Sequence, residues 1–366
     1  MKHTRLLAIS LIPTLCATGA YAAPDTHIHT NAIVAHNIAT TQHMVTQTVF
    51  SSFTNPAHSV THHRRTQSTQ HDNTDPSTLY GRAPMYGTAP MYGEYNDDGS
   101  AGRSGGDTFN TRTTLNNLWL NWQHSDDKAH IDKLSQINSD TDTFMFGVAG
   151  GQTKHTNNLS KWGMYVGFID ATQNNHDLDI KSQGGYFGIY NGNTIGKFGI
   201  QTTINGGAQN NSSETIYGTD EHSNFWAGAA AEFTYDFTLD NTFTLQPGIN
   251  IGYTWIRGEN YTSTSGDTLK NNEFSMLEVI PTLRAIKHIA NGWFGVMDAK
   301  YVITYDDGGD TSVNGISTDP LHTGNYREYG ISLEKHIDAL DISAHISRRD
   351  GARDGWIGGM NIKYAF

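Results

Sequence analysis

The sequence predicts an all-β fold: a twelve-stranded antiparallel transmembrane β-barrel with a short, largely disordered N-terminal segment. Three observations support this prediction. The last twelve residues, Gly355–Phe366, alternate apolar and polar side chains with a period of two and stop on an aromatic residue. Eleven earlier segments have the character of long strands, and the chain opens with a secretory signal. A final strand with exposed aromatic residues would be a sticky sheet edge unless it were paired or covered.

Residues 1–22 have the features of a secretory signal peptide. Lys2 and Arg5 supply the charged head, an apolar run follows, and Ala20 and Ala22 are the small residues that precede cleavage. We therefore expect the chain to leave the cytoplasm and to be cleaved after Ala22. The single cysteine, Cys16, lies inside this segment, so neither a disulfide scaffold nor a thiolate metal site is expected in the remainder.

Residues 23–106 form a polar segment rich in Thr, Asn, Ser and His. The pairs His27/His29 and His62/His63 offer imidazole ligands, but no Asp or Cys partner stands at ligand spacing. We therefore predict a solvated tract with no metal site and no cofactor. A segment this polar buries little apolar surface, so most of it should be disordered in isolation.

Charge and hydropathy exclude two further classes of protein. The net charge of −12 leaves no basic stripe for a nucleic-acid partner. No segment after the signal approaches 18 consecutive apolar residues, so a helical membrane span is not expected. If such a chain resides in a membrane, its strands must close into a barrel, because lipid cannot satisfy open backbone groups.

The last domain, 107–366, consists of long alternating strands joined by connections that alternate between short and long. Tight turns are expected at 191–194, 240–241, 290–292 and 336–339. Long polar loops are expected at 209–223, 258–273 and 306–325. Short turns at one end and long loops at the other are typical of an outer-membrane barrel. The expected strands are 115–124, 142–153, 159–172, 180–191, 195–208, 224–239, 242–257, 274–288, 291–305, 326–336, 339–348 and 355–366.

The strand from Phe243 to Trp255 shows the alternation most clearly. In a water-soluble protein its apolar row would face a core, whereas in a membrane barrel that row faces lipid and the polar row faces the lumen. Strands of 12 to 14 residues exceed the usual length of about 5–6, and aromatic residues near the ends of the row suit the membrane interfaces. Pro247 and Pro281 donate no ladder hydrogen bond, so we expect a bulge at each.

Four short pieces in this order carry a family resemblance: Leu118-Trp119, Gly147–Gln152, Trp162–Gly167 and Phe243–Tyr253. Together with the aromatic end, they make Leu115–Phe366 resemble the C-terminal translocator domain of autotransporters, the type V secretion family. The resemblance implies a barrel in the outer membrane of a Gram-negative bacterium, with a linker helix in its lumen and an N-terminal passenger exposed at the cell surface. What ligand the passenger would bind is left open.

The resemblance also implies partners. Outer-membrane lipid would surround the barrel, and periplasmic chaperones and the outer-membrane assembly machinery would act on the chain. That machinery would read the terminal strand through four outward residues, Met360, Ile362, Tyr364 and Phe366. This chain departs from the family in its short passenger and in Gly105 and Gly106 of the linker, each of which costs a helix about 1 kcal/mol relative to Ala. We therefore expect only Thr108–Asn117 to be helical.

Charged residues on the inward rows are expected to line the lumen. They either keep the linker hydrated and mobile or form a static network of salt bridges, and the sequence leaves both interpretations open. The predicted lumen-lining residues are Glu232, Asp236, Glu278, Arg284, Asp298, Lys300, Glu328, Glu334 and Lys363, with Asp341 and His345 beside them.

No covalent chemistry is predicted. Asn116-Asn117 resembles the pair at which some autotransporters cut their passenger, but the surrounding residues of the family are missing. Asp306-Asp307 and His322 lie in a polar loop, and no Gly-x-Ser-x-Gly elbow is present. The predicted function is a translocator that anchors or exports its own N-terminal segment. The alternatives are a small porin-like channel plugged by that segment and a secreted β-protein outside any membrane.

Overall fold

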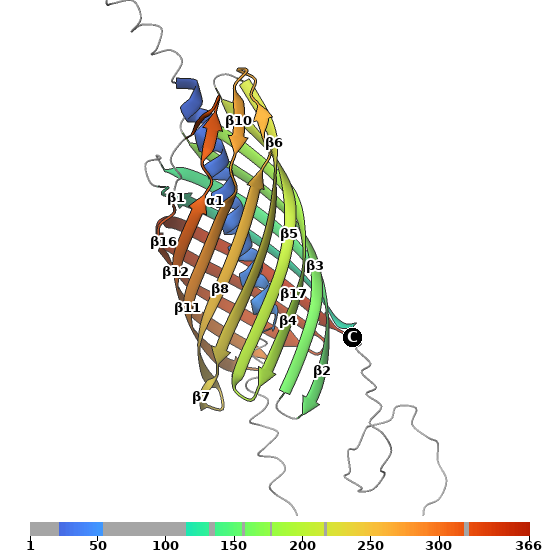
Figure 1. Ribbon diagram of the computed structural model, residues 1–366. Helices are drawn as coiled ribbons and strands as arrows, with labels where there is room; N and C mark the ends of the chain where they lie inside the picture. Colours follow the sequence, from blue (N-terminus) through green and yellow to red (C-terminus); the bar gives the residue numbers. More distant parts are fainter. Residues whose placement is uncertain are drawn as a thin grey trace, which may run out of the picture.

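The computed structural model describes residues 22–53, 115–131, 136–155, 158–175, 178–215, 218–317 and 322–366. These residues form one helix and a closed barrel of long strands (Figure 1). The helix is α1 (Ala22–Phe53). The barrel strands are β1 (Leu115–Ala129), β2 (Ile137–His155), β3 (Asn158–Asn175), β4 (Leu178–Ile195), β5 (Phe198–Thr215), β6 (Gly218–Tyr235), β8 (Phe243–Gly258), β11 (Phe274–Ala290), β12 (Trp293–Gly308), β15 (Tyr326–Ile337), β16 (Leu340–Gly351) and β17 (Arg353–Ala365).

All neighbouring barrel strands are antiparallel, and the twelve expected strands are confirmed. The ring closes between the first and last strands, where Asn117 pairs with Ala365 and Ala129 with Arg353. The short strand β7 (Phe237–Asp240) continues β6 after a one-residue break and pairs with β8. Neither Pro247 nor Pro281 lies at a register shift, so the expected bulges are absent from these strands.

One end of the barrel has short turns and the other carries long loops. At the first end, residues in the left-handed region make the turns, among them Asn291 (φ 49°) and Asp338 (φ 51°). At the opposite end, β9 (Tyr261–Thr262), β10 (Thr268–Asn271), β13 (Thr311–Val313) and β14 (Ile316–Ser317) join into a small separate sheet. We call the end with the short turns the inner end and the end with the long loops the outer end, because outer-membrane barrels have their short turns on the periplasmic side.

Two connections differ from the sequence expectation. The turn expected at 191–194 lies at 196–197, where Gly196 adopts a φ of 62°. Within the expected loop at 209–223, residues 209–215 and 218–223 are strand: β5 and β6 stay paired up to Thr215 and Gly218. Its inward side chains form a polar ladder, in which Asn211 donates to Asn224 at 2.7 Å and accepts from Ser182 at 2.8 Å. A polar composition suggested a loop, but it is also compatible with strands that extend beyond a membrane into water.

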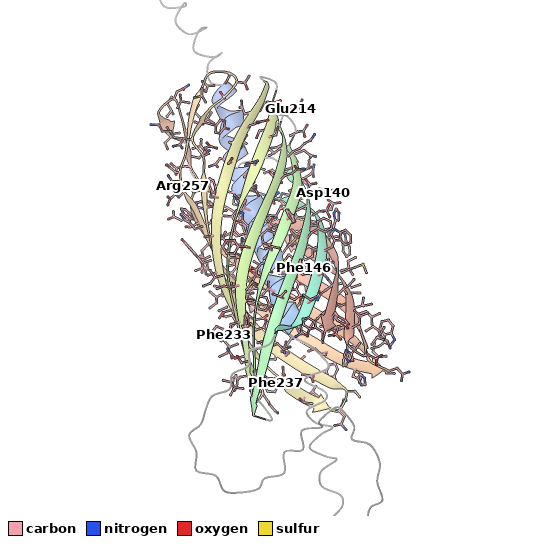
Figure 2. All side chains as sticks on the ribbon, turned by 90° about the vertical axis from the view of Figure 1, so that its right-hand side faces the viewer. Asp140, Phe146, Glu214, Phe233, Phe237 and Arg257 are labelled. Carbon is pink, nitrogen blue, oxygen red and sulfur yellow. The ribbon has the colours of Figure 1, made fainter. Side chains whose placement is uncertain are left out.

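The two faces of the barrel are inverted relative to a protein with an apolar core. Phe168 on β3 points outward and is 68% exposed, whereas Thr143 on β2 points inward and is fully buried. In Figure 2, Phe146 and Phe233 lie nearer the inner end, and the charged residues Asp140 and Glu214 lie toward the outer end. The apolar band of the outer surface is therefore separate from a charged outer zone, as a lipid-facing barrel requires.

Helix α1 occupies the lumen (Figure 1), and its described side chains from Thr30 to Phe50 are almost all buried. Over residues 23–53 the helix replaces the expected disorder, while 54–106 lie outside the described residues. The helix expected at 108–117 is wrong where it can be compared: Leu115–Asn117 belong to β1, and 108–114 lie outside the described residues. Among the described residues, no helix is both long enough and apolar enough to cross a membrane.

One half of the lumen wall is lined by aromatic side chains and the other by charged side chains, and α1 contacts both halves. Four aliphatic residues of the helix (Val34, Ile38, Val45 and Val49) are spaced so that they share one face. They belong to one buried cluster with inward aromatic residues from β1 to β6, namely Trp119, Tyr165, Tyr186, Tyr190 and Trp226. This spacing is the sequence signal that could have identified the helix.

Glycines make room for the aromatic residues. The ring of Tyr165 lies over Gly188 on β4, and the ring of Tyr186 lies over Gly167 on β3. A Cβ at either glycine would overlap the ring. The aromatic side chains also bond to one another across strands: Trp119 on β1 donates to the Tyr190 hydroxyl on β4 at 2.8 Å. This half of the wall is therefore tightly packed against α1.

Candidate functional site

The charged half of the lumen is a network of buried ion pairs near the closing seam. Arg349 on β16 is fully buried and reaches Asp127 on β1 at 2.6 Å and Glu328 on β15 at 3.3 Å. Arg353 on β17 contacts Asp127 at 3.1 Å. Lys300 on β12 contacts Glu328 at 2.7 Å. These pairs join the strands on both sides of the seam through their side chains.

A second buried group lies on β6, β8 and β11. Arg284 on β11 donates to Glu232 on β6 at 2.6 Å and to Gln246 on β8 at 3.1 Å. Gln246 in turn donates to Asp236 at 2.7 Å. Glu232 is fully buried, and within the described residues Arg284 is the cation that pairs with it. Within the described residues, a single ion pair therefore compensates the buried carboxylate of Glu232.

Helix α1 takes part in the network. His43 places one ring nitrogen 3.3 Å from Glu278 and the other 3.6 Å from Glu328. Arg353 donates to the backbone oxygen of His36 at 3.0 Å. His36 and His43 therefore lie inside the barrel, although the sequence places them in a segment expected to be solvated. Of the histidine pairs considered as metal ligands, His62 and His63 lie outside the described residues.

Hydrogen bonds also attach α1 at other levels of the barrel. Asn31 donates to Thr311 of β13 at the outer end, at 3.3 Å. Gln123 on β1 donates to Thr48 at 2.5 Å. The helix therefore runs with its N-terminal part at the outer end and its C-terminal part toward the inner end.

A cavity of about 150 Å³ remains between α1 and the charged wall. Gln47 and Ser51 line it from the helix. The wall side includes six of the nine predicted lumen-lining residues: Arg284, Asp298, Lys300, Glu328, Glu334 and Lys363. Polar groups surround this space on both sides, which makes it suitable for water.

The remaining predicted residues lie elsewhere on the inner wall. Glu278 faces smaller spaces beside α1, and Glu232 and Asp236 belong to the group around Arg284. Asp341 and His345 line the larger cavity. Sequence reasoning missed Asp127, Arg349 and Arg353, although Asp127 continues the inward polar row of Asn121, Gln123 and Ser125 on β1.

The proposed assembly signal lies on the outer face of β17. Its four side chains are exposed, from Ile362 at 40% to Phe366 at 66%. Tyr364 pairs in register with Leu118 on β1 and Leu340 on β16, and its ring stacks near Phe366. The cleavage residue Ala20 lies outside the described residues, and Ala22 is the first residue of α1. Cleavage after Ala22 stays a prediction.

The residues considered for catalysis are placed as follows. Asn117 is paired within β1, opposite Ala149 and Ala365. His322 forms an exposed ion pair with Asp306 at 2.8 Å, and Asp306 also accepts from the Thr323 backbone at 2.7 Å. These contacts hold a loop beside β12 and bring no nucleophile into position among the described residues.

A closed barrel with an apolar belt, a polar lumen and an internal helix defines a class: an outer-membrane β-barrel that encloses part of its own chain. The family model described as "Autotransporter beta-domain" matches residues 117–342. The chain belongs to this family of outer-membrane translocator barrels. No curated protein matches it.

Three solved structures share the fold. The transport unit of the autotransporter AIDA-I from Escherichia coli is 14% identical, covers 70% of this chain and 92% of its own, and has a TM-score of 0.57. The β domain of the Bordetella autotransporter BrkA is 15% identical, with coverage of 69% and 100% and a TM-score of 0.56. The translocator domain of NalP from Neisseria meningitidis is 12% identical, with coverage of 69% and 89% and a TM-score of 0.55.

Proposed function

We propose that this barrel anchors its own N-terminal segment in the outer membrane and exports the leading end of that segment to the cell surface. The observation that carries the proposal is the direction of α1, whose N-terminal part bonds to the outer loop at Thr311 while Thr48 and Ser51 lie toward the inner end. If the signal peptide is removed after Ala22, the new N-terminus lies at the outer mouth.

The positions of the end of α1 and the start of β1 limit how much of the N-terminal segment is exported. Phe53 ends α1 and Leu115 begins β1, and both lie toward the inner end. A continuous chain that leaves and re-enters at one end has no need to cross the barrel between these points. We therefore propose that surface exposure is confined to the start of α1, and that residues 54–114, which lie outside the described residues, stay on the periplasmic side.

The porin-like alternative is favoured by a different observation. The ion pairs of His43 and the hydrogen bond from Arg353 are buried, and they hold α1 where it obstructs the lumen. Such contacts support a static plug, whereas the cavity beside α1 supports a hydrated lining that leaves the helix some freedom. Under this alternative α1 is the plug of a channel, and the N-terminal end of the helix has no role at the cell surface.

Cysteine labelling of intact cells tests the proposal. Cys16 is the single cysteine in the sequence, so a Cys16→Ser background carrying one new cysteine reports one position. A membrane-impermeant maleimide should label Ala23→Cys as well as the outer-loop reference Ile316→Cys. Ser68→Cys should behave like the inner-turn reference Asn241→Cys, which reacts only after the outer membrane is permeabilised.

The outcomes separate the hypotheses. Protection of Ala23→Cys in intact cells, with Ile316→Cys labelled, contradicts export of the leading end and leaves the plugged channel. Labelling of Ser68→Cys in intact cells contradicts the proposed limit and restores a longer surface segment. Both references must differ from each other before either result is interpreted.

A further inference from the structure

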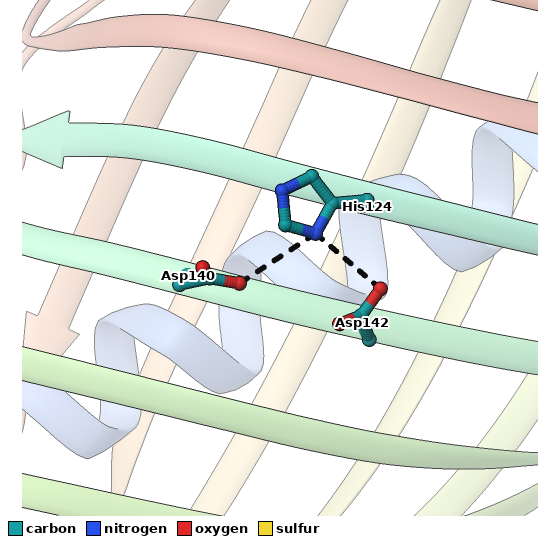
Figure 3. Close-up of side chains that lie close together, drawn as sticks. All are labelled: His124, Asp140 and Asp142. Atoms are coloured by element: carbon teal, nitrogen blue, oxygen red, sulfur yellow. Dashed lines mark ion pairs between the residues drawn. The ribbon is translucent and has the colours of Figure 1, made fainter.

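A mixed cluster of imidazole and carboxylate groups lies on the outer surface of the barrel, away from the lumen. His124 on β1 directs its Nδ1 toward Asp142 at 3.3 Å and toward Asp140 at 3.6 Å, both on β2 (Figure 3). His124 and Asp142 are register partners, so the strand pairing itself brings them together. Within the described residues, this is the one group of three such side chains whose ligand atoms lie within 4.8 Å of one another.

The cluster lies just beyond the apolar belt. On β1 the outward row passes from Leu118 and Leu120 through Trp122 to His124. Asp140 and His124 are 60% and 40% exposed as side chains, so an ion can reach them from water. A third carboxylate, Asp126, is the register partner of Asp140. The outward acidic groups repel one another, and a bound cation would relieve that repulsion.

The distances suit direct coordination. A tetrahedral ion with ligand bonds of about 2.0–2.1 Å places its donor atoms about 3.4 Å apart. The two separations from the imidazole nitrogen, 3.3 and 3.6 Å, bracket this value, and the carboxylate oxygens of Asp140 and Asp142 lie within 4.8 Å of each other. One imidazole and two carboxylates are a ligand set that zinc accepts, with the fourth position left for water.

Trp122 contacts two of the three proposed ligands, Asp142 and His124. Its indole N–H donates to Asp142 at 3.0 Å, and its ring stacks on His124 at 6.5 Å between centroids. Hydrogen bonds of this kind orient ligating side chains in known metal sites. Another histidine–carboxylate pair at the outer end, exposed His322 with the buried side chain of Asp306, belongs to no group of three among the described residues.

We propose that His124, Asp140 and Asp142 bind one divalent cation of the zinc class at the outer rim of the barrel. The bound ion ties β1, a strand of the closing seam, to β2 through side chains in addition to the backbone ladder. The competing interpretation of the same geometry is a contact of the His124 imidazole with two carboxylates and no ion.

The test uses the full-length protein in detergent micelles, labelled with 5-fluorotryptophan and titrated with Zn²⁺ alone. The ¹⁹F resonance of Trp122, assigned with Trp122→Phe, reports this site and is insensitive to zinc bound by other histidines. We expect the resonance to shift and saturate. His124→Asn and Asp140→Asn should each weaken binding at least about tenfold, and the control His322→Asn should leave the titration unchanged.

Three results would overturn the proposal. The first is a Trp122 resonance that does not move with Zn²⁺ while the protein remains folded. The second is the same titration in His124→Asn as in the parent. The third is an equal response to Mg²⁺ at the same concentration, since that ion prefers oxygen ligands and would indicate general attraction to carboxylates.

Discussion

Replacing Arg284 with methionine should destabilise the barrel far more than a similar change at its surface. Arg284 is the cation that pairs with fully buried Glu232, at 2.6 Å. Arg284→Met leaves that carboxylate in the wall without its partner, and it also removes the hydrogen bond to Gln246. Breaking a buried pair in this way costs about 3–5 kcal/mol of unfolding free energy.

The matched surface pair is Arg348 with Asp354, whose side chains are 37% and 42% exposed. Because water screens such a pair, Arg348→Met should cost only about 0.2–1 kcal/mol. The double variant Glu232→Gln/Arg284→Met removes both buried charges, so it should recover most of the loss.

The assay is guanidinium unfolding in detergent, followed by loss of the compact, heat-modifiable form on a gel. The order expected is Arg284→Met least stable, the double variant intermediate, and Arg348→Met close to the parent. If Arg284→Met and Arg348→Met lose the same stability, Glu232 is hydrated or re-paired and the argument from burial is wrong. If the double variant is the least stable, the charges themselves are needed.

Three further predictions concern the plug, the wall and assembly. Deleting residues 24–53 should turn a silent protein into a conducting one in planar bilayers, because α1 fills most of the lumen; equal conductance of both forms would contradict the plug. Gly188→Val should lower the yield of folded barrel several-fold by overlapping Tyr165, and Tyr165→Ala should restore part of it; the control is Gly252→Val, where an added Cβ would meet the Ala230 Cβ at 3.8 Å, an ordinary van der Waals contact. Deleting Phe366 should reduce insertion into the outer membrane more than deleting residues 62–71, and equal effects in quantitative membrane fractionation would argue against a terminal assembly signal.

Strand number and sidedness could be predicted because they are local properties. The alternation from Phe243 to Trp255 assigns each side chain to one face, and the outward aromatic residues Trp356 and Tyr364 of β17 require a covered or lipid-facing surface. Strand ends were less predictable. Residues 209–215 and 218–223 are polar on both faces, and a strand that extends into water has the same composition as a loop.

The twelve strands and the shared face of Arg284 and Glu328 were readable from the sequence, because a period of two is encoded residue by residue. That this face is the lumen followed from the strand length, the aromatic residues near the strand ends and the signal peptide. Which charges meet, and what fills the lumen, became clear from the folded arrangement of the strands. Asp127 joins Arg349 because ring closure places β17, and β16 next to it, beside β1, although Asp127 and Arg349 are more than two hundred residues apart along the chain. The helix 22–53 looked like a disordered polar tract because its Thr, Asn and His side chains suit a polar wall, a surface that exists only after the barrel has closed.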